Sequence, residues 1–237
     1  MYKNNIERTK EANQVFSKEK LLKSLVSTHQ PVIFDIGANI GQSVDYFKSI
    51  WQHSKIYSFE PVSASFETLQ NNVKCYDNIK CYKIALSNYI GNSKFYINEH
   101  QIMLSGFYNL NKHSRDSLAV NQPEPSHFNY FNSSEATVQV ETLDFFCKAN
   151  NVEKIDLLKL DTQGAEPLIL EGASEILKNT SVIISELMLY DLYEKQVSFI
   201  DYEKILIPLG FRLYDISHIS KNPLNGRTDW VEVIYVK

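Results

Sequence analysis

Residues 32–43 read Val32-Ile33-Phe34-Asp35-Ile36-Gly37-Ala38-Asn39-Ile40-Gly41-Gln42-Ser43. The apolar start predicts a buried strand, and the glycines predict a tight turn that opens a helix near Gln42. Gly37 and Gly41 let the backbone come close to a ligand, and the first N–H groups of the helix point into the same space. A strand, turn and helix of this kind form the first crevice of a doubly wound sheet, where such folds bind nucleotides.

The spacing of the glycines differs from the dinucleotide-binding fingerprint. Where that fingerprint has its second and third glycines, this chain has Asn39 and Gln42. Asp35, two residues before Gly37, would repel a pyrophosphate but can pair with an ammonium group directly or through water. The ligand is therefore expected to carry local positive charge.

A second acid ends the next predicted strand, residues 55–60. Glu60 lies roughly 25 residues beyond the first strand, at the place where an acid commonly accepts the hydroxyls of a ribose. An amino-acid end near Asp35 and a ribose near Glu60 describe S-adenosylmethionine better than a phosphate-bearing nucleotide. The alternative is that these acids only cap helices.

The apolar runs predict one α/β domain, residues 31–237, after an N-terminal helical extension, residues 1–30. The expected sheet is doubly wound, seven-stranded and mostly parallel, and it ends in an antiparallel hairpin. Its strands are expected at residues 32–35, 55–60, 80–85, 155–160, 181–186, 211–216 and 230–236. Helices are expected at residues 66–73, 165–177 and 199–206.

Residues 99–136 form a long insertion between two extra strands, expected at residues 93–97 and 137–140. The insertion has little periodicity, and so long a loop in a compact domain is commonly functional. Its aromatic and basic side chains are suited to stack on an acceptor ring and to bond its hydroxyls. They are Phe107, Tyr108, His113, Arg115, His127, Phe128, Tyr130 and Phe131. We predict an acceptor-side insertion, and the alternative is local packing of these rings.

Three residues are candidates for catalysis. Asp161 follows the apolar run 155–160, so its carboxylate is expected in the crevice, where it holds the cofactor's ammonium group, acts as general base, ligates a divalent cation or caps a helix. Glu186 interrupts an apolar stretch and is a second base candidate, unless it forms a structural ion pair with a lysine such as Lys159. His218, in the expected loop before Pro223, is the third. No dense carboxylate cluster favours a metal site, so a divalent cation is possible but not favoured.

These segments together resemble the FkbM family of S-adenosylmethionine-dependent methyltransferases. The resemblance covers Val32 to about Leu189 and rests on Phe34–Gly41, Phe59–Pro61, Ala85–Ser87, Glu141–Asp144, Asp156–Glu166 and Glu186. It implies a class I, Rossmann-like methyltransferase fold with the adenine near Ala85 and Leu86. Family members usually carry Glu where this chain has Gln163, which leaves no charge for any role at that position. The residue pattern and the resemblance together predict the cofactor-binding residues. They are Asp35, Gly37, Ala38, Asn39, Gly41, Gln42, Ser43, Glu60, Pro61, Ala85, Leu86 and Asp161.

The composition of the chain limits the kinds of partner that are expected. The 237 residues carry a net charge of −4 with scattered Lys and Arg, which disfavours nucleic acid as the acceptor. No apolar run approaches the roughly 18 residues that span a bilayer, and the N-terminus lacks a signal-peptide core, so a soluble, cytoplasmic protein is expected. Cys75, Cys81 and Cys147 have no metal-ligand or dithiol spacing. The oligomeric state is open.

The resemblance implies transfer of the cofactor's methyl group to an oxygen, most plainly a sugar hydroxyl of a polysaccharide, glycolipid or glycosylated metabolite. Alignment of the reactants would then supply much of the acceleration, and a carboxylate or His would remove the hydroxyl proton. Two alternatives belong to other classes. One is a nicotinamide-dependent oxidoreductase on a similar sheet, and the other is a cofactor-binding scaffold module without catalysis.

Overall fold

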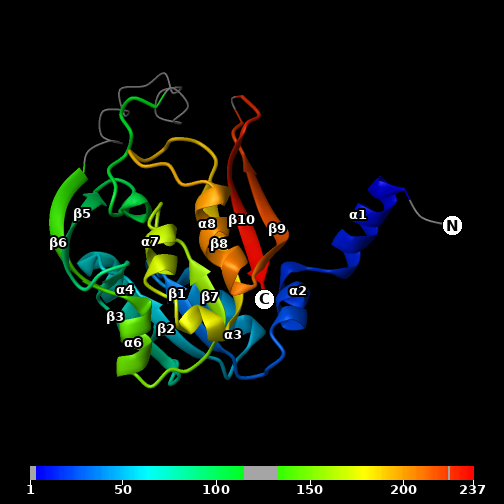
Figure 1. Cartoon of the computed structure of the whole chain (residues 1–237), viewed down its shortest axis with the longest axis horizontal. Coiled ribbons are helices and arrows are strands. Elements are labelled where there is room, and N and C mark those ends of the chain that lie inside the picture. The colour runs from blue at the N-terminus through cyan, green and yellow to red at the C-terminus, as the bar shows by residue number, and fades with distance from the viewer. Residues whose placement is uncertain (1–3, 115–132, 224) are drawn as a thin grey trace.

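In the computed structural model, which describes residues 4–114, 133–223 and 225–237, seven strands form one mixed sheet (Figure 1). The strand order is β3-β2-β1-β7-β8-β10-β9, with parallel pairing from β3 to β8 and antiparallel pairing of β10 with β8 and β9. The strands are β1 Val32–Ile36, β2 Lys55–Phe59, β3 Ile79–Tyr82, β7 Ile155–Leu160, β8 Thr180–Met188, β9 Arg212–Lys221 and β10 Thr228–Val236. This confirms the predicted doubly wound sheet with its C-terminal hairpin.

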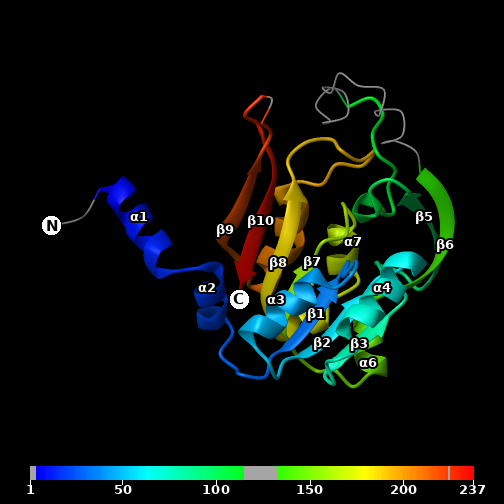
Figure 2. The same cartoon turned by 180° about the vertical axis from the view of Figure 1, so that it is seen from behind.

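Helices cover both faces of the sheet, as the opposite views of Figures 1 and 2 show. Successive side chains of a strand point to opposite faces, so β1 gives Ile33 to one core cluster and Phe34 to the other. α2 (Lys18–Leu25), α3 (Gln42–Ile50) and α4 (Ser63–Val73) pack on the Ile33 side, whereas α6 (Leu143–Ala149), α7 (Glu166–Glu171) and α8 (Phe199–Leu206) pack on the Phe34 side. Short 3-10 turns complete the chain at Ile102–Leu104, Ile176–Asn179 and Ile207–Leu209. Burial on both faces explains why the central strands β1 and β7 are largely apolar along their length.

The N-terminal segment contains two helices. α1 (Asn5–Val15) extends away from the sheet, whereas α2 lies against it (Figure 2). Leu22 of α2 is fully buried in the core, and Lys18 Nζ lies 2.6 Å from a carboxylate oxygen of Glu232 on β10. α2 therefore shares both the core and a charge pair with the sheet.

A second, three-stranded sheet holds part of the predicted insertion region. β5 (Gly91–Asn98) pairs antiparallel with β6 (Ser133–Glu141), as expected for the two extra strands, and β4 (Ala85–Leu86) pairs parallel with β6. The predicted strand 80–85 is therefore wrong at its end, because β3 stops at Tyr82 and Ala85 belongs to this other sheet. Arg115, His127, Phe128, Tyr130 and Phe131 lie outside the described residues.

Two further boundaries differ from the prediction. The helix expected over 165–177 ends at Glu171, and Gly172 follows it against the backbone of Ser87, whose carbonyl oxygen lies 2.1 Å from the position of a Cβ at residue 172. His218 is not in a loop: it lies in β9, opposite Glu232 of β10. The hairpin strands are longer than predicted and reach Lys221 and Thr228.

Candidate functional site

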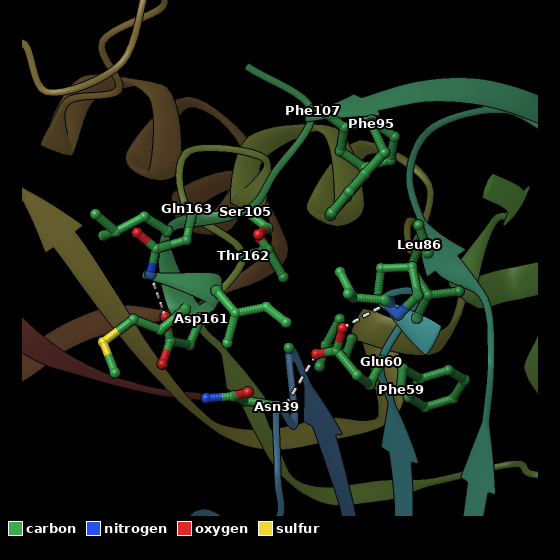
Figure 3. A pocket seen from close by; sticks show the side chains of 18 of the residues that line it. Asn39, Phe59, Glu60, Leu86, Phe95, Ser105, Phe107, Asp161, Thr162 and Gln163 are labelled. Atoms are coloured by element: carbon green, nitrogen blue, oxygen red, sulfur yellow. Dashed lines mark hydrogen bonds between the residues drawn. The ribbon is translucent and has the colours of Figure 1, made fainter. Parts of the chain in front are cut away.

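A cavity of about 270 Å³ lies at the carboxyl ends of the central strands (Figure 3). It extends from the ends of β1 and β2 across β7 to β8 and β10, and residues 102–105 and Phe107 line it as well. The lining residues are Ile36, Gly37, Asn39, Phe59, Glu60, Pro61, Val62, Ile84, Ala85, Leu86, Phe95, Ile102, Met103, Leu104, Ser105, Phe107, Asp161, Thr162, Gln163, Glu186, Met188 and Trp230. This is where a doubly wound sheet binds ligands.

The turn after β1 forms one wall of the cavity. Gly37, Asn39 and Gly41 all have positive φ, at 79°, 46° and 100°. A Cβ at residue 37 would lie 1.9 Å from the carbonyl oxygen of Asp161, so glycine is required there because the β7 backbone comes so close. Gly41 does not line the cavity, and its missing side chain instead makes room for Leu69 of α4.

Glu60 ties this turn to the end of β2. Its carboxylate accepts the backbone N–H of Asn39 at 3.0 Å and that of Val62 at 2.8 Å, and the side chain also lines the cavity. Burial raises the pKa of Glu60 to about 7, although the two hydrogen bonds pull it down. Each oxygen keeps a lone pair, so a ligand hydroxyl can still donate to this carboxylate.

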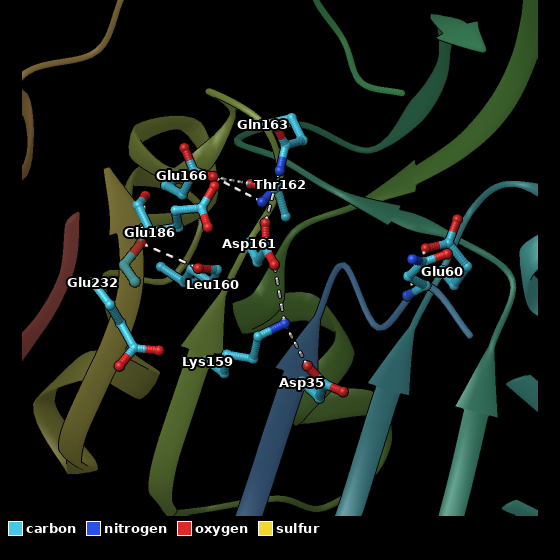
Figure 4. A network of polar contacts seen from close by, with 12 residues as sticks. Asp35, Glu60, Lys159, Leu160, Asp161, Thr162, Gln163, Glu166, Glu186 and Glu232 are labelled. Carbon is cyan, nitrogen blue, oxygen red and sulfur yellow. Dashed lines mark hydrogen bonds and ion pairs between the residues drawn. The ribbon is translucent and has the colours of Figure 1, made fainter. Parts of the chain in front are cut away.

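A buried charge network lies behind the cavity (Figure 4). Lys159 Nζ of β7 lies 3.2 Å from a carboxylate oxygen of Asp35 on β1 and 3.5 Å from one of Asp161. Burial raises the pKa of Asp35, and Lys159 acts in the opposite direction. Burial alone would lower the pKa of Lys159, but the two carboxylates raise it. Asp35 is fully buried and does not line the cavity, so a direct contact with a ligand is not available to it in this conformation.

Asp161 is held at the cavity edge by its own loop. Its carboxylate accepts the side-chain N–H of Gln163 at 2.8 Å, and the hydroxyl of Tyr193 donates to the other end of the same amide. The buried carboxylate of Glu166 accepts the N–H groups of Thr162 and Gly164 at 2.7 and 3.1 Å, which fixes the turn. Gln163 lines the cavity as a neutral link, so it neither repels nor replaces the charge of Asp161.

Glu186 of β8 lines the same cavity beside Asp161. β7 and β8 pair in parallel with Leu160 opposite Ser185, so Asp161, just past the end of β7, lies next to Glu186, which is still within β8. Burial, together with the charges of Asp161 and Glu166, raises the pKa of Glu186 to about 8. The alternative ion pair with Lys159 is not found, because Lys159 pairs with Asp35 and Asp161.

The cavity therefore includes seven of the twelve predicted cofactor-binding residues and two of the three catalytic candidates. The seven are Gly37, Asn39, Glu60, Pro61, Ala85, Leu86 and Asp161, and the two are Asp161 and Glu186. Asp35, Ala38, Gly41, Gln42, Ser43 and His218 do not line it. The sequence interpretation missed Phe59, Met188 and Trp230, because an apolar residue near a strand end reads as core.

The charge of the cavity fits a cationic cofactor. Glu60, Asp161 and Glu186 line it, and none of its described lining residues is Lys, Arg or His. A pyrophosphate would be repelled by such a wall, whereas the sulfonium and ammonium groups of S-adenosylmethionine would be attracted. Among the described residues, no group of three or more His, Cys, Asp or Glu side chains is arranged to hold a metal ion.

The fold is that of a class I S-adenosylmethionine-dependent methyltransferase, and the cavity lies where this fold binds ligands. The chain belongs to the methyltransferase FkbM domain family, whose family model matches residues 35–213. This confirms the resemblance noted in the sequence, and it removes the support for a nicotinamide-dependent oxidoreductase.

Named relatives extend the comparison. The chain is 28% identical over 183 residues to the 2-O-methyltransferase NoeI of Sinorhizobium fredii (strain NBRC 101917 / NGR234), covering 73% of this chain and 70% of that one. It is 28% identical over 146 residues to methyltransferase 1 of Beauveria bassiana (strain ARSEF 2860), covering 60% and 58% of the two chains. The crystal structure of methyltransferase FkbM from Methylobacillus flagellatus KT superposes with a TM-score of 0.54 at 13% identity. That match covers 88% of this chain but only 44% of the other, and it supports the fold alone.

Across residues 4–114, 133–223 and 225–237, no helix is both long enough and apolar enough to cross a bilayer.

Proposed function

We propose that this methyltransferase transfers the methyl group to oxygen, and that its acceptor is a sugar hydroxyl. The observation that carries the proposal is the pair of carboxylates, Asp161 and Glu186, side by side in one cavity with the pKa of Glu186 raised to about 8. A hydroxyl is a poor nucleophile until its proton leaves, and a base with a pKa near the working pH removes it best. The name of NoeI specifies 2-O-methyl transfer and agrees with an oxygen acceptor.

The cofactor would lie along the wall made by β1, β2 and β7. Glu60 accepts the ribose hydroxyls, and the small side chain of Ala85, next to Leu86, leaves room for the adenine. Gly37 and Asn39 approach the methionine part, and Asp161 faces its ammonium group. Each of these residues lines the cavity. Asp35 acts on this end only through Lys159, which pairs with both Asp35 and Asp161.

In the proposed reaction, different residues of this chain bind the cofactor and accept the proton. When bound, S-adenosylmethionine supplies a methyl group activated by its sulfonium charge. Glu186 accepts the proton of the acceptor hydroxyl. A positive charge beside it would lower its pKa, so that more of the carboxylate is ionised and able to take that proton. Asp161, held by Gln163 and Lys159, orients the methionine end. Alignment of the hydroxyl with the methyl group supplies the larger part of the acceleration, up to about 7–11 kcal/mol for well-oriented groups.

A neutral acceptor suits the cavity better than an anionic one. The carboxylates that attract the cofactor would repel phosphates, which also argues against nucleic acid as the acceptor. Cys75, Cys81 and Cys147 are free thiols, which supports placing the reaction in the cytoplasm, a reducing compartment.

Calorimetric titration with S-adenosylmethionine, followed by single-turnover methyl transfer to a panel of neutral glycosides, tests the proposal. We expect micromolar cofactor binding and methylated glycoside, with Glu186→Gln slowing transfer by at least a hundredfold at unchanged cofactor affinity. Glu67→Gln, on the exposed face of α4, is the matched control and should transfer at the wild-type rate. Tight cofactor binding without transfer to any acceptor would favour the non-catalytic scaffold module instead.

A further inference from the structure

We propose that Trp230 is the acceptor platform of this enzyme, on which a neutral sugar ring stacks while its hydroxyl meets Glu186. The inference deepens the proposed function and rests on it. It assigns a binding role to a residue of the C-terminal hairpin that lies outside the matched region, residues 35–213.

Trp230 lies at the far end of the cavity from the expected ribose. Glu60 follows β2 and Trp230 lies in β10, and the order β2-β1-β7-β8-β10 places four strand spacings between them. At about 4.8 Å per spacing, the two ends are about 19 Å apart. Asp161 and Glu186 lie between these ends, on β7 and β8, so a ligand that passes them reaches Trp230 next.

The indole is held in place by its neighbours. The ring of His218 packs against Trp230 with centroids 4.7 Å apart and planes inclined by 33°. Met188 of β8 lies directly opposite Trp230 in the antiparallel pair and also lines the cavity. An oriented indole beside a thioether forms a flat, apolar surface, which is the shape that the C–H face of a sugar ring covers. His218, the third catalytic candidate from the sequence, does not line the cavity, and in this proposal it has the role of a positioning residue for this ring.

The charges beside the platform select the class of ligand. A sugar has an apolar C–H face and hydroxyl donors at its rim, so it can stack on Trp230 and donate to Glu186 and Asp161 in one pose. A phosphorylated or carboxylated acceptor would bring a second negative charge next to these acids. The platform is thus suited to a neutral sugar ring.

The chain contains two tryptophans, which makes the platform directly observable. Trp51 is 5% exposed in the core, so Trp51→Phe leaves Trp230 as the single tryptophan, whose fluorescence can be excited selectively. With saturating S-adenosylhomocysteine present, this variant would be titrated with methyl glycosides of neutral hexoses and 6-deoxyhexoses. Methyl glucuronide and catechol serve as the anionic and the phenolic comparison probes.

We expect saturable quenching by at least one neutral glycoside and none by the glucuronide. In methyl-transfer assays, Trp230→Ala should raise the acceptor KM at least tenfold without changing cofactor affinity. Trp230→Phe, which keeps an aromatic ring, should have an acceptor KM within about threefold of the wild-type value. Tyr214→Ala, 55% exposed on β9, is the matched control and should behave as wild type. Thermal unfolding of each variant verifies that it is folded, and the Phe variant keeps the test valid if the Ala variant is not.

Three results would overturn the assignment: no quenching by any neutral glycoside, quenching by catechol or glucuronide alone, or an unchanged acceptor KM in Trp230→Ala. If glycosides are methylated normally in that variant, only the platform is refuted and the proposed function stands. If the wild-type protein binds no S-adenosylhomocysteine, both the platform and the proposed function fail.

Discussion

Replacing Lys159 with Met should lower the free energy of unfolding, because the substitution leaves the buried carboxylate of Asp35 without its ion-pair partner. Asp35 is fully buried, and Lys159 Nζ, 3.2 Å away, is its ion-pair partner. Removing one member of a buried pair costs about 3–5 kcal/mol, because the other charge stays desolvated. In a chain of this size each kcal/mol shifts Tm by about 2–4 °C, so a loss of about 3 kcal/mol lowers Tm by roughly 6–12 °C.

The loss should depend on pH with a definite sign. Burial raises the pKa of Asp35 in the folded state, and removing Lys159 raises it further. An acid whose folded pKa lies above its unfolded value contributes stability at low pH and loses it as pH rises through the folded pKa. The Tm difference between Lys159→Met and wild type should therefore be smaller at pH 5 than at pH 8.

The assay is thermal unfolding followed by circular dichroism at both pH values. Lys23→Met is the matched control, because Lys23 pairs with Glu19 at 2.7 Å with both side chains nearly half exposed, and such pairs are worth less than about 0.5 kcal/mol. The double variant Asp35→Asn/Lys159→Met should recover at least half of the lost stability, since no charge is left buried. A Lys159→Met protein within 1 kcal/mol of wild type at pH 8, or a double variant no better than the single one, would refute this reasoning.

Further outcomes are expected at the same site. Glu60→Ala should weaken S-adenosylmethionine binding at least tenfold, about 1.4 kcal/mol, in a calorimetric titration, and unchanged affinity would place the ribose elsewhere. At subsaturating acceptor, the methyl-transfer rate of the wild-type protein should rise with pH through about 8, because burial raises the pKa of Glu186 to about 8 and the base acts when deprotonated. Glu186→Gln should flatten this pH profile. Gly37→Ala should lower Tm far more than Gly226→Ala, since both residues have φ near +75° but a Cβ at 37 meets the Asp161 carbonyl at 1.9 Å and one at 226 meets nothing within 4 Å. Equal Tm losses in the two glycine variants would show that the clash is relieved by movement.

The parts of the fold that the sequence predicted well are those governed by local pattern. β7 and β1 are buried on both faces, so their short apolar runs, bounded by polar and glycine residues, predicted central strands. Glu60 and Asp161 follow such strands, and the carboxyl ends of parallel strands meet at one edge of the sheet. Both acids accordingly line the cavity.

The errors have a different origin, because they depend on contacts between distant segments. Ala85 pairs with Val140, and nothing near residue 85 shows that its strand belongs to a second sheet. Residue 41 is a glycine because a side chain there would press on Leu69 and Val73 of α4, about 30 residues away, and not because a ligand comes close. His218 lies on an edge strand with most of its residues exposed, so no alternation of apolar and polar residues marked it as a strand.

The two ends of the cavity are built in different ways, and this has a consequence for redesign. Around the expected cofactor, the wall is fixed by a carbonyl against Gly37, by backbone N–H groups on Glu60 and by a buried ion pair, so few exchanges are tolerated there. Around the expected acceptor, the wall consists of interchangeable side chains on the antiparallel strands, on residues 102–105 and on Phe107. Retargeting this enzyme to a new substrate is therefore a matter of exchanging side chains on one wall, while the methyl-donating half of the molecule is left untouched.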